Sequence, residues 1–124
     1  MKNVLWLSLL ICGIMACSNE EKEAEMTMQR QLLGNWQLAS AKRAGKDTDS
    51  LRGLYFEFAQ GGNMKTNILS IAEEGTYSIE EGTIQQRNTQ MNVDYLIETL
   101  NDTALVLLTN LRETDFRFTL KKAE

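Results

Sequence analysis

Short stretches of alternating hydrophobic and polar residues recur along the chain from Leu33 onward, separated by Gly, Asn or Asp. A repeat of about 8 to 12 residues is typical of an all-β barrel or sandwich, because each alternating stretch forms a strand with one buried face. No long helical period interrupts the series, and the absence of Pro suits unbroken strand pairing. The pattern predicts strands at 33–42, 54–60, 64–71, 76–80, 83–87, 93–99, 105–109 and 115–121.

Pairs of turn-forming residues separate several of these strands. Gly61-Gly62 is a strong hairpin signal, because both glycines adopt positive φ without strain. Glu81-Gly82 and Asn101-Asp102 are weaker signals of the same kind. The longest connection, residues 43–53, is largely polar, and we expect it to form an exposed loop over one mouth of the barrel.

Trp36 is the residue around which the expected sheet closes. It is the only Trp after the N-terminal segment, and alternation places it on one face with Gly34, Leu38 and Ser40. The same alternation, applied to the later strands, predicts a continuous apolar lining. Its expected members in those strands are Leu54, Phe56, Phe58, Met64, Thr66, Ile68, Tyr77, Ile79, Ile84, Phe116, Phe118 and Leu120.

The first residues of the chain have the composition of a signal peptide. Lys2 supplies one positive charge, residues 4–16 are mostly apolar, and Cys17 follows directly. A membrane-spanning helix needs roughly 20 apolar residues, whereas this run is shorter and ends in small residues of the kind that a signal peptidase accepts. We therefore expect residues 1–16 to be removed.

The tetrapeptide Ile14-Met15-Ala16-Cys17 resembles a bacterial lipobox. In that motif the Cys thiol is alkylated by diacylglycerol and becomes the acylated first residue, and acyl chains at about 0.8 kcal/mol per buried CH₂ form a stable anchor. By the same resemblance, Ser18 favours the outer membrane. The alternative is an ordinary secretory signal in which Cys17 has no such role. Because Cys12 would leave with the signal, no free thiol would remain for a disulfide or a metal.

The mature chain would be acidic near its start. Loss of Lys2 changes the formal net charge from −4 to −5, and residues 18–29 carry four Glu and one Lys. We expect residues 17–29 to form a lipidated, flexible tether and residues 30–124 to form one domain. The acidic run is either a solvated spacer or, because it resembles the surface-export signals of Bacteroidetes-type lipoproteins, an export tag. No basic face is visible, so nucleic acid is not an expected partner.

The order and spacing of several motifs resemble the small lipocalin-like domain of Bacteroidetes-type lipoproteins. These motifs are the Gly-x-Trp strand at 34–36, residues 54–58 with the glycine turn after them, the Gly75-Thr76-Tyr77 step and the run 95–107. The resemblance implies an eight-stranded antiparallel up-and-down β-barrel with an Arg over the Trp36 indole. Arg117 is the nearest candidate, although alternation points it outward. A helical turn at 25–32 would plug the closed end of such a barrel, and a loosely docked tether explains the same apolar residues equally well.

The residue types exclude most catalytic chemistry. The chain has no His and no glycine-rich phosphate loop, so imidazole nucleophile pairs and ordinary zinc sites are excluded. The carboxylate pairs Glu73-Glu74 and Glu80-Glu81 lie beside turns, and neighbouring residues of a strand point to opposite faces. Neither pair is therefore expected to converge on one substrate bond. We expect no enzyme activity, no metal and no cofactor.

A barrel of eight short strands is either filled by side chains or holds one small ligand. We expect a small hydrophobic ligand, bound by a monomer that is anchored through Cys17 to the outer membrane of a Gram-negative cell envelope, on either face. The expected ligand-binding residues are Trp36, Leu38, Phe56, Phe58, Ile68, Tyr77 and Phe118. The alternative is a packed barrel that binds another envelope protein, as an inhibitor or accessory subunit. Val106 and Leu108, apolar on an outward face, would contact that partner, although a covering loop or Tyr95 explains them equally well.

Overall fold

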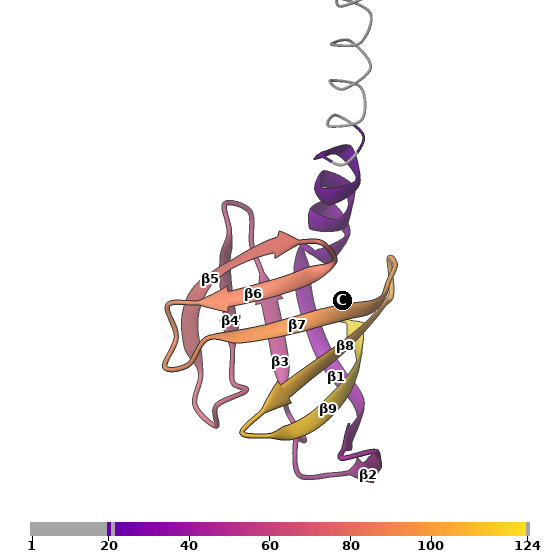
Figure 1. Ribbon diagram of the computed structural model, residues 1–124, viewed down its shortest axis with the longest axis vertical. Helices are drawn as coiled ribbons and strands as arrows, with labels where there is room; N and C mark the ends of the chain where they lie inside the picture. The colour runs from indigo at the N-terminus through magenta and orange to yellow at the C-terminus, as the bar shows by residue number, and fades with distance from the viewer. Residues whose placement is uncertain (1–19, 21, 124) are drawn as a thin grey trace, which may run out of the picture.

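The computed structural model describes residue 20 and residues 22–123. The expected signal peptide, the tetrapeptide that resembles a lipobox and Cys17 lie outside these residues. Residues 20 and 22–32 are helical, and nine strands follow in the described part of the chain (Figure 1). The strands are β1 (Gly34–Arg43), β2 (Lys46–Thr48), β3 (Tyr55–Phe58), β4 (Asn63–Thr66), β5 (Glu73–Glu80), β6 (Thr83–Arg87), β7 (Val93–Leu100), β8 (Ala104–Leu111) and β9 (Thr114–Lys122).

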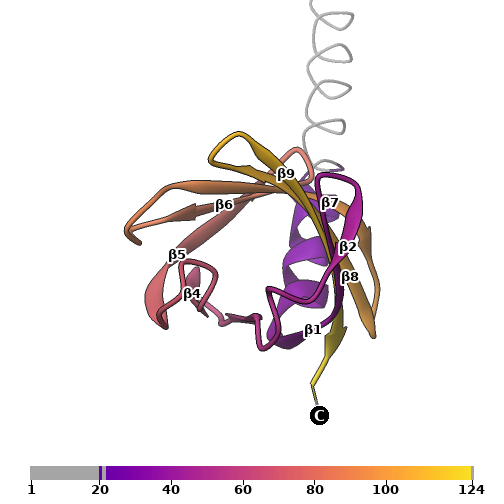
Figure 2. The same ribbon diagram turned by 90° about the horizontal axis from the view of Figure 1, so that it is seen from below.

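One antiparallel sheet closes on itself, as the end-on view in Figure 2 shows. The strand order is β2-β1-β3-β4-β5-β6-β7-β8-β9, and β9 pairs with β1 to complete the ring. β3 pairs with residues 34–37 on the other edge of β1, and β2 pairs with residues 41–43 further along that edge. The barrel therefore has eight strands in up-and-down order, with β2 as a short appended hairpin. This confirms the predicted fold class.

The predicted turns are confirmed. Gly61 and Gly62 have φ values of 84° and 83° between β3 and β4, and Glu81-Gly82 has values of 49° and 75° between β5 and β6. At the third turn the side chain of Asn101 accepts a hydrogen bond from the backbone N–H of Ala104 at 2.9 Å.

Two predicted segments differ from the observed ones. The strand expected at 64–71 ends at Thr66, because residues 67–70 form a turn in which Ser70 has a φ of 78°. The loop expected at 43–53 contains β2, because Ala44-Gly45 form a tight hairpin that returns the chain along β1. A tight turn therefore ends the expected strand early in the first case, and in the second case a tight hairpin divides the expected loop.

The helix before β1 overlaps the segment in which we expected a flexible tether. Residues 22–29 are helical because most of them are strong helix formers, namely Glu, Lys, Ala, Met and Gln. The helical turn predicted at 25–32 is confirmed, and the helix extends further toward the N-terminus. Leu32 is fully buried and Met28 half-buried, whereas Met26 is 52% exposed, so the helix contacts the barrel mainly through its last turns. In the described part of the chain, no helix has both the length and the apolar character needed to cross a membrane.

Two β-bulges change which side chains point inward. In β1, Leu38 pairs with Leu120 of β9 and Ser40 pairs with the neighbouring Thr119. Ala39 therefore has no partner in β9 and is the extra residue of the bulge. Ala41 is therefore buried, whereas Ser40, predicted to share the face of Trp36, is exposed. A similar shift in β7 makes Glu98 the extra residue.

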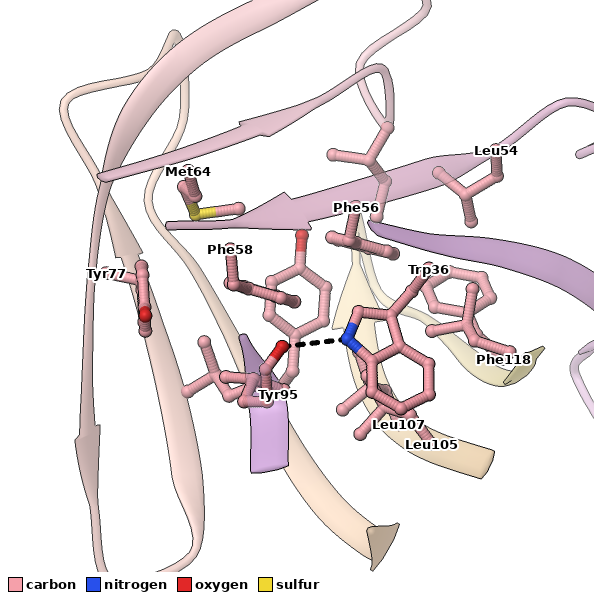
Figure 3. Packing of buried hydrophobic residues seen from close by; sticks show 14 of the residues in the cluster. Trp36, Leu54, Phe56, Phe58, Met64, Tyr77, Tyr95, Leu105, Leu107 and Phe118 are labelled. Carbon is pink, nitrogen blue, oxygen red and sulfur yellow. Dashed lines mark hydrogen bonds between the residues drawn. The ribbon is translucent and has the colours of Figure 1, made fainter. Parts of the chain in front are cut away.

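Aromatic rings fill much of the barrel interior (Figure 3). Phe56 stacks on Phe58 with ring centroids 6.0 Å apart, and Tyr95 meets Phe56 edge-on at 5.3 Å. Tyr77 meets Phe58 edge-on at 5.0 Å. The predicted interior is confirmed at Trp36, Leu54, Phe56, Phe58, Met64, Thr66, Ile68, Tyr77, Ile84, Phe118 and Leu120. Leu38, Ile79 and Phe116 pack against this core but are only partly buried.

Candidate functional site at the barrel mouth

The helix lies at one end of the barrel, and the opposite end is the open mouth. Antiparallel neighbours alternate in direction, so every second connection of an up-and-down barrel lies at the same end. At the mouth these connections are residues 49–54, 67–72, 88–92 and 112–113. Figure 2 views the barrel from this side, with the helix behind the ring of strands.

A pocket of about 380 Å³ opens at the mouth. This volume lies within the range of about 300–1,000 Å³ that small-molecule sites occupy. Its apolar wall consists of Leu51, Ile68, Leu69, Met91, Leu111, Phe116 and Phe118. Its polar lining consists of Arg43, Ser50, Ser70, Arg112 and Thr114.

Asn67 ties two of the mouth loops together. Its Oδ1 accepts a hydrogen bond from the backbone N–H of Tyr55 at 3.0 Å, and its Nδ2 donates to the carbonyl oxygen of Gly53 at 2.9 Å. The buried hydroxyl of Thr66 donates to the carbonyl oxygen of Tyr55 at 2.9 Å. These bonds cross-link loops 49–54 and 67–72, and they hold the part of the wall that contains Leu51 in place.

A chain of hydrogen bonds links the core to the other side of the mouth. The hydroxyl of Tyr95 donates to Oε1 of Gln86 at 2.7 Å, and both side chains are fully buried. Nε2 of Gln86 donates to Oγ1 of Thr89 at 2.9 Å, and Thr89 in turn donates to the carbonyl oxygen of Met91 at 2.9 Å. Burial raises the pKa of the Tyr95 hydroxyl, so it remains a neutral donor. The network therefore supports the pocket wall at Met91.

The charge of the pocket lining is positive. Arg43 and Arg112 both line the pocket, and none of its described lining residues is acidic. The Cζ atom of Arg43 lies 5.9 Å from the ring centroid of Phe116, a distance at which a cation is attracted to an aromatic face. Among the described residues neither arginine has an ion-pair partner.

The structure brings only some of the predicted ligand-binding residues to this pocket. Ile68 and Phe118 line it. Phe56, Phe58 and Tyr77 belong to the packed aromatic interior, Trp36 lies under the helix, and Leu38 is half-buried on β1. These five do not line the pocket.

Most of the lining was missed, because it comes from loops and strand ends without an alternating pattern. Arg43, Leu51, Met91, Leu111 and Arg112 are examples. The strand order would have found them. In an up-and-down barrel every second connection lies at the same end, so the predicted strands already place the four mouth segments together. The buried Gln86 also had a signal, since it stands two residues after the inward-pointing Ile84.

The closed end has a different chemistry. Nε1 of Trp36 donates to the carbonyl oxygen of Leu32 at 2.8 Å, the dashed line in Figure 3. Nζ of Lys122 lies 5.1 Å from the Trp36 ring centroid and donates to the carbonyl oxygen of Gln31 at 3.4 Å. Lys122 therefore has the position over the indole that the resemblance gave to an Arg. Arg117 points outward, as alternation predicted, and pairs with Glu98 at 2.9 Å.

The neighbouring carboxylates of Glu73 and Glu74 have different partners. Oε1 of Glu73 accepts the backbone N–H of Gln90 at 3.1 Å, whereas Glu74 pairs with Lys65 at 3.3 Å. Within residues 22–123, no group of three or more His, Cys, Asp or Glu side chains is placed to hold a metal ion. The mouth pocket, with apolar walls, hydroxyl groups and cations, has the features of a binding site.

The barrel is lipocalin-like. The chain is similar to a lipocalin-like protein from Bacteroides uniformis, with 18% identity and a TM-score of 0.56 over 75% of this chain and 99% of that one. It is also similar to an uncharacterized protein from Bacteroides eggerthii, with 17% identity and a TM-score of 0.52 over 74% of this chain and 99% of that one. No family model and no curated protein matches the sequence. The shared fold confirms the architecture that the sequence motifs predicted.

Proposed function

We propose that this lipocalin-like protein binds a small, largely apolar molecule in its mouth pocket. The observation that carries this proposal is the pocket of about 380 Å³ with an apolar wall. Phe118 lines the pocket and is fully buried, and its ring centroid lies 6.4 Å from that of Phe56 in the core. A ligand would therefore rest on Phe118 and remain in the mouth half of the barrel.

A neutral fluorescent dye tests this proposal. N-phenyl-1-naphthylamine gains fluorescence in apolar surroundings, so its titration gives an affinity for the pocket. Met91→Trp places a larger side chain on the pocket wall and should weaken binding at least about tenfold, which corresponds to about 1.4 kcal/mol. Met26→Trp makes the same change on the exposed side of the helix and should leave binding unchanged. Equal dye affinity in both variants, with native far-UV circular dichroism, would exclude this pocket as the site.

We also propose that the mature protein is a lipoprotein of a Gram-negative cell envelope, anchored to the outer membrane as a monomer. The support is Ala16-Cys17 at the end of the N-terminal apolar run. Cys17→Ala should give protein that neither incorporates labelled palmitate nor fractionates with membranes. Label and membrane association that persist in Cys17→Ala would contradict the anchor.

A second function is favoured by one feature of the outer wall. Leu96 is 49% exposed and lies opposite Leu108 in the pairing of β7 with β8. Val106, predicted to face a partner, is only 8% exposed, so the apolar surface centres on Leu96. If another envelope protein binds there, Leu96→Lys should release it in a pull-down, and Met26→Lys should not.

A further inference from the structure

We infer that the mouth pocket selects an amphiphile with a single anionic head group, a carboxylate or a phosphate monoester, and an apolar tail. This inference rests on the proposed function. In the bound state, the tail would lie on the wall around Phe118 and the head would lie between Arg43 and Arg112.

The two arginines reach the pocket from separate parts of the barrel. Arg43 ends β1 and stands opposite Phe116 of β9, with its guanidinium held over the Phe116 ring. Arg112 belongs to the two-residue connection between β8 and β9. Two cations at the rim of one apolar cavity match a ligand whose charge is at one end.

Among the described residues, no acidic side chain forms an ion pair with Arg43 or Arg112, although Glu113 follows Arg112 in the same connection. Asp49 pairs with Arg52 at 3.9 Å, and Asp94 pairs with Arg87 at 2.8 Å. Asp115 accepts a hydrogen bond from the side chain of Asn110 at 2.8 Å and is not part of the pocket lining. The lining itself adds the hydroxyl groups of Ser70 and Thr114, which can donate to an anionic oxygen.

The turn that carries Arg112 has non-glycine residues at both of its left-handed positions. Arg112 and Glu113 both have positive φ, at 51° and 67°. Two other tight hairpins, Ala44-Gly45 and Glu81-Gly82, have Gly at the second position, which adopts this conformation without strain. Left-handed non-glycine residues cluster at ligand sites when the surrounding structure holds them.

A pair of dyes that differ by one charge tests the inference. 1-Anilinonaphthalene-8-sulfonate has the same aromatic frame as N-phenyl-1-naphthylamine and adds an anionic sulfonate. Both arginines are solvent-exposed, so their joint contribution to binding should be about three- to tenfold in affinity. We expect the wild-type protein to bind the anionic dye more tightly by this factor, and the preference to weaken as ionic strength rises.

Matched variants test whether Arg43 and Arg112 cause the preference for the anionic dye. Arg43→Gln with Arg112→Gln should abolish the preference for the anionic dye, so that the ratio of the two dye affinities in the double variant falls to about one. Arg117→Gln removes an Arg from the outer wall and should leave both affinities unchanged. Wild-type protein that binds the two dyes equally, or a double variant that keeps the preference, would overturn the inference while the apolar pocket stands. Failure of both dyes to bind wild-type protein would instead overturn the proposed function.

Displacement of the anionic dye then distinguishes the sources of the head group. Decanoate, decyl phosphate and decanol share one tail length. Displacement by decanoate alone indicates a fatty-acid carboxylate, and displacement by decyl phosphate alone indicates a phosphate monoester. Decanol that displaces as well as both anions would overturn the selection of an anionic head.

Discussion

The indole of Trp36 is hydrogen-bonded to the backbone of Leu32, four residues earlier in the chain, through a buried contact of 2.8 Å. A helix leaves its last carbonyl groups without partners, and this bond satisfies one of them. Lys122 satisfies the carbonyl group of Gln31 and places a cation near the negative end of the helix dipole. The helix is therefore fastened to the barrel by the strands that close it, β1 and β9.

Replacement of Trp36 should separate the packing of the ring from its hydrogen bond. Trp36→Ala should lower the free energy of unfolding by about 3–5 kcal/mol, the range for removal of a large buried aromatic side chain. Trp36→Phe keeps an aromatic ring but leaves the carbonyl of Leu32 unsatisfied, so it should cost about 1–3 kcal/mol. Urea unfolding of the mature protein measures both values. Native Trp36 emission that is red-shifted and freely quenched would contradict the burial on which both values depend.

Lys122 and Lys121 form a matched pair for testing the contact with the helix. Lys122→Met keeps the apolar stem but removes the charge over the indole and the donor to Gln31, and should cost about 1 kcal/mol. Lys121→Met changes an exposed neighbour and should fall within about 0.5 kcal/mol of wild type. Equal effects of the two substitutions on urea unfolding would show that the contact does not stabilise the helix.

The strand pattern could be predicted because alternation is local, but the details of the first strand could not. Whether Ser40 or Ala41 faces inward depends on the bulge at Ala39, which is defined by pairing with residues of β9 far along the chain. The position of Lys122 over Trp36 also depends on the pairing of β1 with β9. A Cβ on Gly34 would lie 2.8 Å from Cε of Lys122, so the glycine of the Gly-x-Trp strand leaves room for a side chain from the other end of the chain. No local pattern contains that relation.

The site was harder to predict than the fold. Aromatic residues such as Phe56 and Phe58 were expected to contact a ligand because they face inward, yet they pack against each other. The pocket instead collects loop residues, and loops have no periodicity from which direction can be read. Phe118, one of the expected ligand-binding residues, lines the pocket because it lies where the packed interior ends and the mouth begins.

The buried hydroxyl of Tyr95 should make stability depend on alkaline pH. Burial raises its pKa above the ordinary value of 10.0, which applies in the unfolded chain. The folded state therefore keeps a proton that the unfolded state loses, so the contribution is complete below pH 10.0 and is lost as the pH rises above it. The slope is about 1.4 kcal/mol per pH unit for one such group. The pKa of Tyr77 is also raised by burial, and the Gln29 side chain partly offsets this.

Tyr95→Phe isolates the contribution of this hydroxyl. At about pH 8 the variant should be less stable by about 1 kcal/mol, because Oε1 of Gln86 loses its donor. Above about pH 10 the gap should narrow, since only the wild-type chain gains from ionisation of Tyr95 on unfolding. Urea unfolding across this range measures the gap, and a gap that stays constant would show that the Tyr95 hydroxyl titrates normally in the folded protein.

The hairpin between β8 and β9 should become more stable when Glu113 is replaced by Gly. Glu113 has a φ of 67° in a turn whose second position favours Gly, so Glu113→Gly should raise the free energy of unfolding by about 0.5–1 kcal/mol. The reciprocal change, Gly82→Glu, places a side chain at a φ of 75° where a Cβ meets no atom within 4 Å, so its cost of about 1 kcal/mol is purely conformational. Urea unfolding compares the two. A variant that is no more stable than wild type, beside a Gly82→Glu that loses stability, would show that Glu113 makes a compensating contact at the mouth.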